Sequence, residues 1–530
     1  MSSLSKILLF LFLSLGITQE LLAKKRMRIE EREIPTQSSE SSLKTLFNSL
    51  DPHSVSQHLA FYELYSETKE GTTALKRAWQ LLGGGGPLSE KESATTLPIV
   101  DFQAIISLVT RQSFDAPVKL SEEQLDLITK ISSRLCNRKL KGYRVWTKEE
   151  VLQLLPEEVD LARGLLIFQF DESNDPKNEI RQYEASIDLI ALQIAARLPA
   201  NATYEDKIRE INRFIFQEMQ FRFPPHSLYA NDIDLYTFLP SVLDSRQGVC
   251  LGVSILYLSL AQRLDLPLEI ITPPGHIYVR YNNGRKIINI ETTARGIDLP
   301  SETYLGINTR HLQKRDIKEV IGMAFFNQAA VFWSKQDYTK TVTLYEKALP
   351  FLSEDPLLKM FMGFNYLFVG RNSEGIKLLR EIRHLTFEEA VSPETIPDDY
   401  LSGKIDVEGI KAIFLPVDET RESILKKQKE LEQILKRYPN FRAGTLHLAT
   451  TWLQLGRTNE AKEILETYHK LDPHYCVVEY YLAVLSINRL DYHQSWNYLK
   501  QAESLAASRG HHPKALRAIR ESLCRSCPES

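Results

Sequence analysis

Apolar residues recur at three- and four-residue steps over much of the chain, which is the pattern of helices that bury one face. A clear example begins at Cys250 and continues to Leu264, before Leu266-Pro267 ends it. Residues 43–154 show similar spacing and predict a helical N-terminal region. We therefore expect a mostly helical chain.

After Pro267 the pattern changes and predicts strands at 268–271, 276–281 and 285–291. Asn283-Gly284 separates the last two strands and is typical of a two-residue hairpin turn. If these two residues form the loop, His276 lies directly opposite Glu291 on one face of the hairpin. A slip of one residue would break this pairing, so the prediction depends on the turn.

Cys250, His276 and Glu291 are the candidate catalytic residues. Cys250 opens its helix, and the backbone N–H groups at a helix start favour a thiolate and can hold a developing oxyanion. His276 would take and return a proton, and Glu291 would orient His276. The competing interpretation is structural, because a free cysteine often serves as a small buried apolar residue.

Several short sequence segments, in a fixed order along the chain, resemble those of a known family. They include Asp160-Leu-Ala162, Phe238-Leu-Pro-Ser-Val-Leu243, Arg246-Gln-Gly-Val249, Pro274-Gly-His276 and Ile290-Glu291. Over residues 155–300 the chain resembles the SirB-like transglutaminase-fold branch of the papain-type cysteine enzymes. The resemblance implies a domain, here 155–312, with Cys at a helix start and His and an acid on successive antiparallel strands. Two positions depart from the family pattern: many members carry proline at the Cys250 position, and the acid, usually Asp, is Glu291.

From about residue 320, small residues recur at an interval of 34 residues. The recurring pairs are Ala329 with Gly363, Ala449 with Ala483, Thr341 with Gly375, and Ala461 with Ser495. The period resembles the tetratricopeptide repeat and predicts an α-solenoid over 315–530. The spacing breaks between Gly363 and Ala449, which predicts an irregular insert near 385–417 and a charged helix over 418–436. Contacts chiefly between neighbouring repeats would let this array fold apart from 155–300.

The fold class expected from these patterns is α+β, in about three domains for 530 residues. Stacked repeats make an extended concave surface, so we expect a protein or peptide partner; the alternative is a purely structural solenoid. The net charge is −3, from 65 basic and 68 acidic residues. This lack of basic excess argues against nucleic acid as the main partner.

Residues 1–23 match a secretory signal peptide, because Lys6 precedes the apolar run 7–17 and Leu21-Leu-Ala23 suits cleavage. Residues 24–42 are polar and charged and predict a linker. We expect a bacterial protein that is exported, periplasmic or secreted. The basic residues within 24–28 favour one alternative, an uncleaved inner-membrane anchor, and only then would the membrane be a partner.

Five cysteines are too few for a disulfide scaffold. Cys524 and Cys527 have the spacing of a redox or half-zinc motif but lack a βαβ context. We expect a terminal disulfide or two free thiols there, and neither a metal nor a cofactor in the chain.

These features predict an exported cysteine hydrolase or acyltransferase whose peptide or protein substrate is recruited by the repeats. The alternative belongs to another class: a non-catalytic scaffold or adaptor that uses the same fold and repeats for protein binding.

Overall fold

The computed structural model describes residues 40–83, 102–111, 117–224, 236–418 and 420–528. The predicted signal peptide 1–23 lies outside these ranges. The predicted linker 24–42 also lies outside them, apart from residues 40–42, which belong to α2 (Glu40–Asn48). The described chain is mostly helical with one small antiparallel sheet, which confirms the predicted α+β class.

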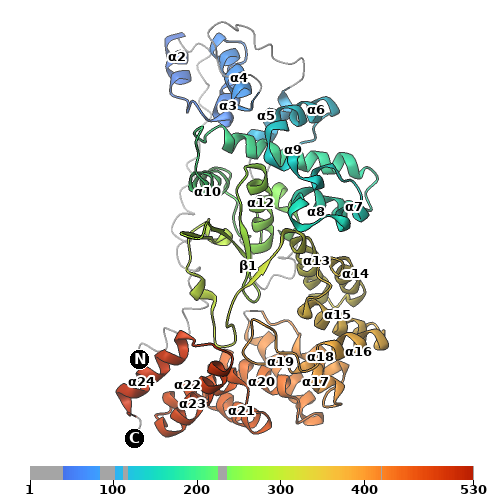
Figure 1. Cartoon of the computed structure of the whole chain (residues 1–530), viewed down its shortest axis with the longest axis vertical. Helices are drawn as coiled ribbons and strands as arrows, with labels where there is room; N and C mark the ends of the chain where they lie inside the picture. Colours follow the sequence, from blue (N-terminus) through green and yellow to red (C-terminus); the bar gives the residue numbers. More distant parts are fainter. Residues whose placement is uncertain (1–39, 84–101, 112–116, 225–235, 419, 529–530) are drawn as a thin grey trace.

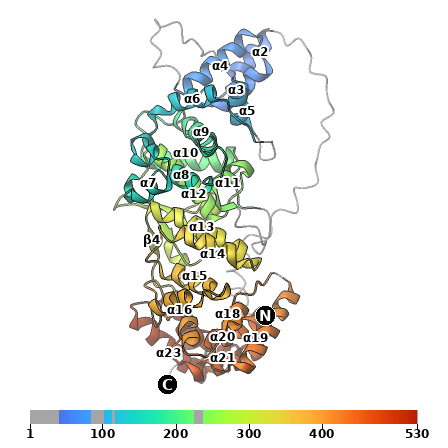
Figure 2. The same ribbon diagram turned by 90° about the vertical axis from the view of Figure 1, so that its right-hand side faces the viewer.

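The N-terminal helices pack at one end of an elongated molecule (Figures 1 and 2). They are α3 (Val55–Leu64), α4 (Lys69–Leu81), α5 (Gln103–Thr110), α6 (Glu122–Ile131) and α7 (Lys148–Gln153). Most of their buried side chains belong to the same hydrophobic core as those of α8 (Leu161–Gln169) and α9 (Pro176–Ala195). The N-terminal region therefore extends the core of the residues that follow it. None of the described helices combines the length and apolar character needed to cross a membrane.

Helix α12 (Cys250–Arg263) lies near the middle of the molecule and is buried on almost all sides (Figure 1). Its sequence is apolar around most of the circumference, as such burial requires. Its one charged residue, Arg263, is buried, and the guanidinium Nε donates to Asp188 Oδ1 of α9 at 2.7 Å. Removing one partner of a buried ion pair typically costs about 3–5 kcal/mol. This pair therefore fixes α12, and Cys250 with it, against α9.

Two further helices and a π-helical segment complete the surroundings of α12. They are α10 (Tyr204–Asn212), the π-helix η5 (Arg213–Glu218) and α11 (Leu239–Ser245). Tyr257 of α12 donates from its hydroxyl to Asn212 Oδ1 at 3.0 Å, and Asn212 Nδ2 donates to the carbonyl oxygen of Gly296 at 3.2 Å. These bonds join α12 and α10 to the loop that follows the hairpin.

The sheet has four antiparallel strands in the order β3-β2-β1-β4. They are β1 (Glu269–Thr272), β2 (Tyr278–Asn282), β3 (Ile287–Ile290) and β4 (Gln313–Arg315). Strand β2 packs against α12. The sheet therefore places the hairpin β2–β3 beside the helix that begins at Cys250.

The hairpin turn differs by one residue from the predicted Asn283-Gly284. The Asn283 N–H donates to the carbonyl oxygen of Lys286, so Gly284 and Arg285 form the loop. Gly284 has a φ of 81°, and glycine at the first loop position is typical of a type II′ turn. Asn283 Oδ1 accepts from the N–H groups of Arg285 and Lys286, which stabilises this arrangement.

The predicted register was therefore wrong, but His276 and Glu291 still lie on the same face of the hairpin. Val279 pairs with Ile290 and Asn282 with Ile287, so His276 and Glu291 are not directly opposite each other. When a two-residue loop moves by one residue along the chain, each residue of one strand pairs with a residue two positions further along the other strand. Because side chains alternate with a period of two, this displacement keeps both on one face as diagonal neighbours.

The C-terminal part of the chain is an array of helix pairs. The pairs are α13 (Ile317–Ser334) with α14 (Tyr338–Ala348), α15 (Pro356–Phe368) with α16 (Asn372–Glu381), α20 (Arg442–Gln454) with α21 (Thr458–Leu471), and α22 (Cys476–Asn488) with α23 (Tyr492–Ser508); α24 (Lys514–Ser526) follows. The predicted insert contains the short helices α17 (Ile396–Leu401) and α18 (Val407–Ile413). The predicted charged helix is α19 (Arg421–Arg437), capped by Thr420.

The small residues that recur every 34 positions are all buried. A Cβ added at Gly375 would lie 2.7 Å from the carbonyl oxygen of Gly363, so two helices meet there at close range. At the corresponding position further along, Ser495 Oγ donates to the carbonyl oxygen of Ala483 at 2.8 Å. These crossings are where the sequence period placed them, and the predicted repeat architecture is confirmed.

Helix α13 packs mainly against α14 of its own pair, but it also packs against the preceding domain, which the repeat spacing did not predict. The ring of Phe325 lies 5.6 Å from that of Phe238 and 6.1 Å from that of Phe168, centroid to centroid. Lys318 Nζ donates to the carbonyl oxygen of Leu152 at 2.6 Å. One hydrophobic core runs from the N-terminal helices through α12 to α15. The array therefore begins inside the core of the preceding domain.

The far end of the array also contacts the sheet-bearing part of the chain. His511 Nε2 lies 2.8 Å from the carbonyl oxygen of Gly306, and Arg310 Nη1 donates to the carbonyl oxygen of Arg509 at 2.9 Å. Both Gly306 and Arg310 lie in the segment that leads to β4. The array consequently curves, and its last helices return beneath the sheet (Figure 1).

Candidate active site

Cys250 is the first residue of α12 and is partly exposed. No side chain caps this helix start, since the N-cap residue is Val249. Gly252 allows the chain to approach closely, because a Cβ there would lie 2.1 Å from the carbonyl oxygen of Tyr236. The thiol therefore sits beside N–H groups that can stabilise negative charge.

His276 lies in the turn directly before β2, and 23% of its side chain is exposed. Its Nε2 is 2.7 Å from Glu291 Oε2, so the other ring nitrogen, Nδ1, takes no part in this contact. Burial lowers the pKa of His276, but hydrogen bonds with Cys250 and Glu291, together with their charges, raise it overall to about 10. The imidazole of His276 is therefore protonated at neutral pH.

Glu291 follows β3 and is almost fully buried. Its Oε1 accepts from Thr293, from the backbone N–H at 3.1 Å and from the hydroxyl at 2.6 Å. Its Oε2 accepts from His276 and from the hydroxyl of Tyr304. Burial raises the pKa of Glu291, but the hydrogen bond and charge of His276, with Thr293 and Tyr304, hold it below its ordinary value.

A second set of contacts joins the start of α12 to the end of the hairpin. Ser254 Oγ lies 3.0 Å from Thr292 Oγ1, and Thr292 Oγ1 donates to the carbonyl oxygen of Cys250 at 3.4 Å. Thr292 is the residue after Glu291. The backbone positions of Cys250 and Glu291 are thus linked independently of His276.

The structure brings together all three residues that the sequence singled out. Their arrangement can transfer a proton between a thiol and an imidazole whose other nitrogen is held by a carboxylate. Sequence analysis missed Thr292, Thr293 and Tyr304. Tyr304 reaches the site from a 3₁₀ turn, η8 (Ser301–Tyr304), after a stretch without regular spacing, so no periodic pattern could have placed it.

Other chemistry-bearing groups lie elsewhere. Within the described residues, no group of three or more His, Cys, Asp or Glu side chains comes together as a metal site would require. Cys524 and Cys527 are exposed at the end of α24 and are not joined to each other in the structure.

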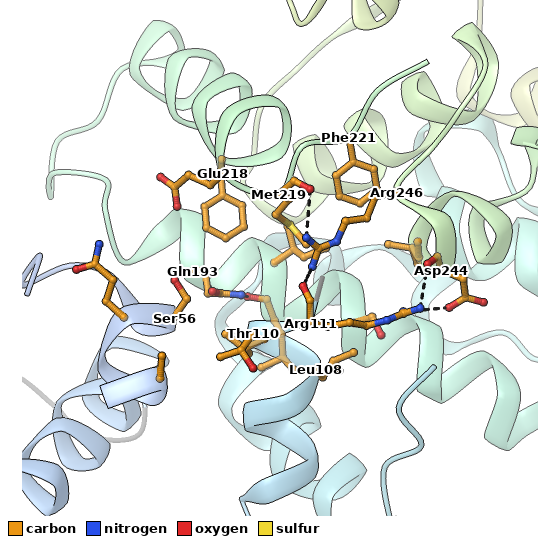
Figure 3. Close-up of a pocket in the computed structure, with 18 residues that line it drawn as sticks. Ser56, Leu108, Thr110, Arg111, Gln193, Glu218, Met219, Phe221, Asp244 and Arg246 are labelled. Atoms are coloured by element: carbon orange, nitrogen blue, oxygen red, sulfur yellow. Dashed lines mark hydrogen bonds and ion pairs between the residues drawn. The ribbon is translucent and has the colours of Figure 1, made fainter. Parts of the chain in front are cut away.

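A cavity of about 300 Å³ lies between the N-terminal helices and α9, η5 and α11 (Figure 3). Arg246 extends along its wall and donates from Nη1 to the carbonyl oxygen of Met219 at 3.2 Å. Beside it, Arg111 Nη1 forms an ion pair with Asp244 Oδ1 at 3.3 Å. None of the three candidate catalytic residues lines this cavity, so it is separate from the candidate site.

Comparison with known proteins finds a match over the segment that contains this site. Residues 181–319 match the model of the Transglutaminase-like superfamily, so the chain contains a transglutaminase-like domain. A UPF0162 protein of Xylella fastidiosa strain Temecula1 is 20% identical over 246 residues, which cover 43% of this chain and 85% of the relative. A UPF0162 protein of strain 9a5c is 20% identical over 234 residues, which cover 41% of this chain and 80% of the relative.

Solved structures with some similarity to the chain include MamA, a domain of yeast Sti1 and YrrB. MamA is 13% identical with a TM-score of 0.20, covering 34% of this chain and 96% of its own. The TPR2AB domain of yeast Sti1, in a complex with pHSP90, is 16% identical with a TM-score of 0.20, covering 39% and 86%. YrrB, described as a TPR protein with an unusual peptide-binding site, is 15% identical with a TM-score of 0.20, covering 37% and 91%.

Proposed function

We propose that this chain is a cysteine-dependent hydrolase or acyltransferase that acts on an amide carbonyl of a peptide or protein. The observation that carries the proposal is His276, which lies 2.7 Å from Glu291 through its Nε2 and whose pKa is raised by the neighbouring Cys250 and Glu291. The match of residues 181–319 to the Transglutaminase-like superfamily supports it. Cys250 is the nucleophile, His276 carries the proton, and Glu291 orients His276.

In the first half-reaction, Cys250 Sγ forms a bond to the amide carbon while His276 holds the proton. N–H groups in the first turn of α12 stabilise the oxyanion. His276 then protonates the leaving nitrogen as the C–N bond breaks, which leaves a thioester on Cys250. In the second half-reaction, water or an amine gives a proton to His276 and attacks the carbonyl. The C–S bond breaks, the thiolate of Cys250 leaves, and His276 keeps the proton, which restores the starting state.

In this proposal, the helical array binds the substrate and brings it to the candidate active site. Its pairs of helices curve away from and back toward the transglutaminase-like domain, so a chain bound along the array would lie near that domain (Figure 1). Stacked helix pairs offer extended surfaces for peptides and proteins. The partner is therefore proposed to be a protein or peptide.

Replacing Cys250 by alanine should abolish turnover while leaving the fold intact. Candidate reactions are release of ammonia from glutamine peptides, appearance of new peptide N-termini, and incorporation of a fluorescent primary amine into protein glutamine. Because the nucleophile is lost, we expect at least about a thousandfold decrease in rate. Cys136→Ala is the matched control, since Cys136 is also a partly exposed free cysteine. If Cys250→Ala retains wild-type turnover, or if neither protein turns over any substrate in a broad screen, the scaffold alternative is favoured.

We also propose that the chain is exported through its N-terminal segment, on the evidence of the apolar run 7–17 and Leu21-Leu-Ala23. Residues 1–40 fused to a reporter that is active only outside the cytoplasm should give signal. The control fusion carries Leu9→Arg and Leu11→Arg, which interrupt the apolar run. Equal signal from both fusions, or none from either, would contradict export by this segment. An exported protein that retains Met1 would support the anchored form.

A further inference from the structure

Tyr304 touches both members of the histidine–carboxylate pair. Its hydroxyl donates to Glu291 Oε2, the same oxygen that lies 2.7 Å from His276 Nε2. Its ring stacks on the imidazole with centroids 5.5 Å apart and an angle of 24° between the planes. It also stacks on Tyr278, at 5.1 Å and 18°. One side chain thus makes a polar contact with the carboxylate and an apolar contact with the imidazole.

We infer that Tyr304 is a positioning residue that orients Glu291 through its hydroxyl and covers His276 with its ring. The inference rests on the proposed function, because it assigns a role within the same site. Glu291 has one more rotatable bond than aspartate, and a longer side chain loses more conformational freedom when it is fixed. Thr293 fixes Oε1, and Tyr304 completes the donors to Oε2.

Tyr304 is itself held in place by a network on β2 and β3. Ser301, the first residue of η8, has its Oγ 3.1 Å from the Tyr278 hydroxyl. Arg280 Nη2 donates to the same Oγ at 2.7 Å. Asn289 Nδ2 donates to it at 3.2 Å. An orienting residue is effective only when its own position is fixed, and these contacts meet that requirement.

The hydroxyl of Tyr304 can donate its hydrogen bond to Glu291 at every pH at which the site is expected to work. Burial, together with the hydrogen bond and charge of Glu291, raises the pKa of Tyr304 above its ordinary value. The hydroxyl therefore keeps its proton over the whole range in which His276 is charged. Donation to Oε2 stabilises the carboxylate form of Glu291, which is the form that orients His276.

The test compares Tyr304→Phe, which keeps the ring, with Tyr304→Leu, which removes both the ring and the hydroxyl. The first readout is alkylation of Cys250 by iodoacetamide in the full chain, resolved from the other cysteines by mass spectrometry. The second is the downfield N–H proton signal of His276 in protein labelled with ¹⁵N-histidine. Tyr281→Phe is the matched control: it removes a hydroxyl from the same strand as Tyr278, and its ring packs on Tyr204.

We expect Tyr304→Phe to slow alkylation at pH 7 roughly fivefold, the loss typical of one intramolecular hydrogen bond, and to weaken the His276 signal. We expect Tyr304→Leu to slow alkylation further and Tyr281→Phe to match the wild type. If both Tyr304 variants keep the wild-type rate and signal, whatever their melting temperatures, the inference is overturned and the proposed function stands. If wild-type Cys250 reacts no faster than Cys250 in His276→Ala, the proposed function fails and the inference fails with it.

Discussion

His276→Ala should slow alkylation of Cys250 at pH 7 by roughly tenfold, because an isolated thiol with a pKa of about 8.5 is only a few per cent thiolate at that pH. In the wild type, the charged imidazole of His276 lies beside the thiol, and a neighbouring positive charge favours the thiolate form. The lower intrinsic nucleophilicity of a stabilised thiolate keeps the expected difference near tenfold rather than larger. The measurement is the second-order rate with iodoacetamide, resolved at Cys250 by mass spectrometry.

The pH dependence follows from the direction of the histidine shift. The pKa of His276 is raised from 6.5 to about 10, so its charge and the stability it contributes are fully present below 6.5. Both are lost as the pH rises through about 10. The wild-type rate should therefore stay nearly constant from pH 7 to about 9.5, whereas the rate of His276→Ala should rise through the ordinary thiol range near 8.5.

His384→Ala is the matched control, because His384 lies in the helical array with 69% of its side chain exposed. It should reproduce the wild-type profile. If the wild-type rate rises with pH in the same way as that of His276→Ala, the two side chains share no proton at neutral pH. The geometry of the site would then be structural, as the interpretation of Cys250 as a small apolar residue requires.

The sequence correctly predicted that a hairpin brings His276 and Glu291 together, although the predicted register was wrong. The Asn283-Gly284 signal identified a hairpin, but glycine occupies the first loop position, and the register moved accordingly. Alternation of side chains tolerates a displacement of two, so His276 and Glu291 still meet. Tyr304 shows the limit of this reasoning: its turn is held by Tyr278 and Arg280 of β2, and local spacing contains no trace of such contacts.

In the helical array too, contacts between neighbouring helices could be predicted from the sequence, whereas contacts with distant parts of the chain could not. Small residues at Gly363 and Gly375 mark a helix crossing, which depends only on two adjacent helices, and the period revealed it. The attachment of α13 to the preceding domain depends on partners such as Phe168, far away in sequence. The sequence did contain one indication of this attachment, because residues 317–334 are apolar around most of the helix circumference. A helix of that kind is buried on more than one side.

Phe325→Ala should destabilise both the array and the transglutaminase-like domain, by about 3–5 kcal/mol in the free energy of unfolding. Phe325 is 2% exposed, and its ring contacts Phe168 of α8 and Phe238 at the start of α11. Removing the ring leaves a cavity inside the core that the two parts share. Denaturant unfolding, followed by hydrogen exchange resolved along the chain, measures the effect and its location.

Leu482→Ala is the matched control, because Leu482 is fully buried but belongs to a separate cluster formed by α20, α21 and α22. It should speed hydrogen exchange in those helices and leave α8 and α11 unchanged. Phe325→Ala should speed exchange in α8, α11 and α13 together, since a shared core loosens on both sides of the lost ring. If Phe325→Ala instead loosens only α13 to α16, the array is energetically autonomous, as its 34-residue period alone implied. A fragment of residues 315–530 would then fold without the domain that precedes it.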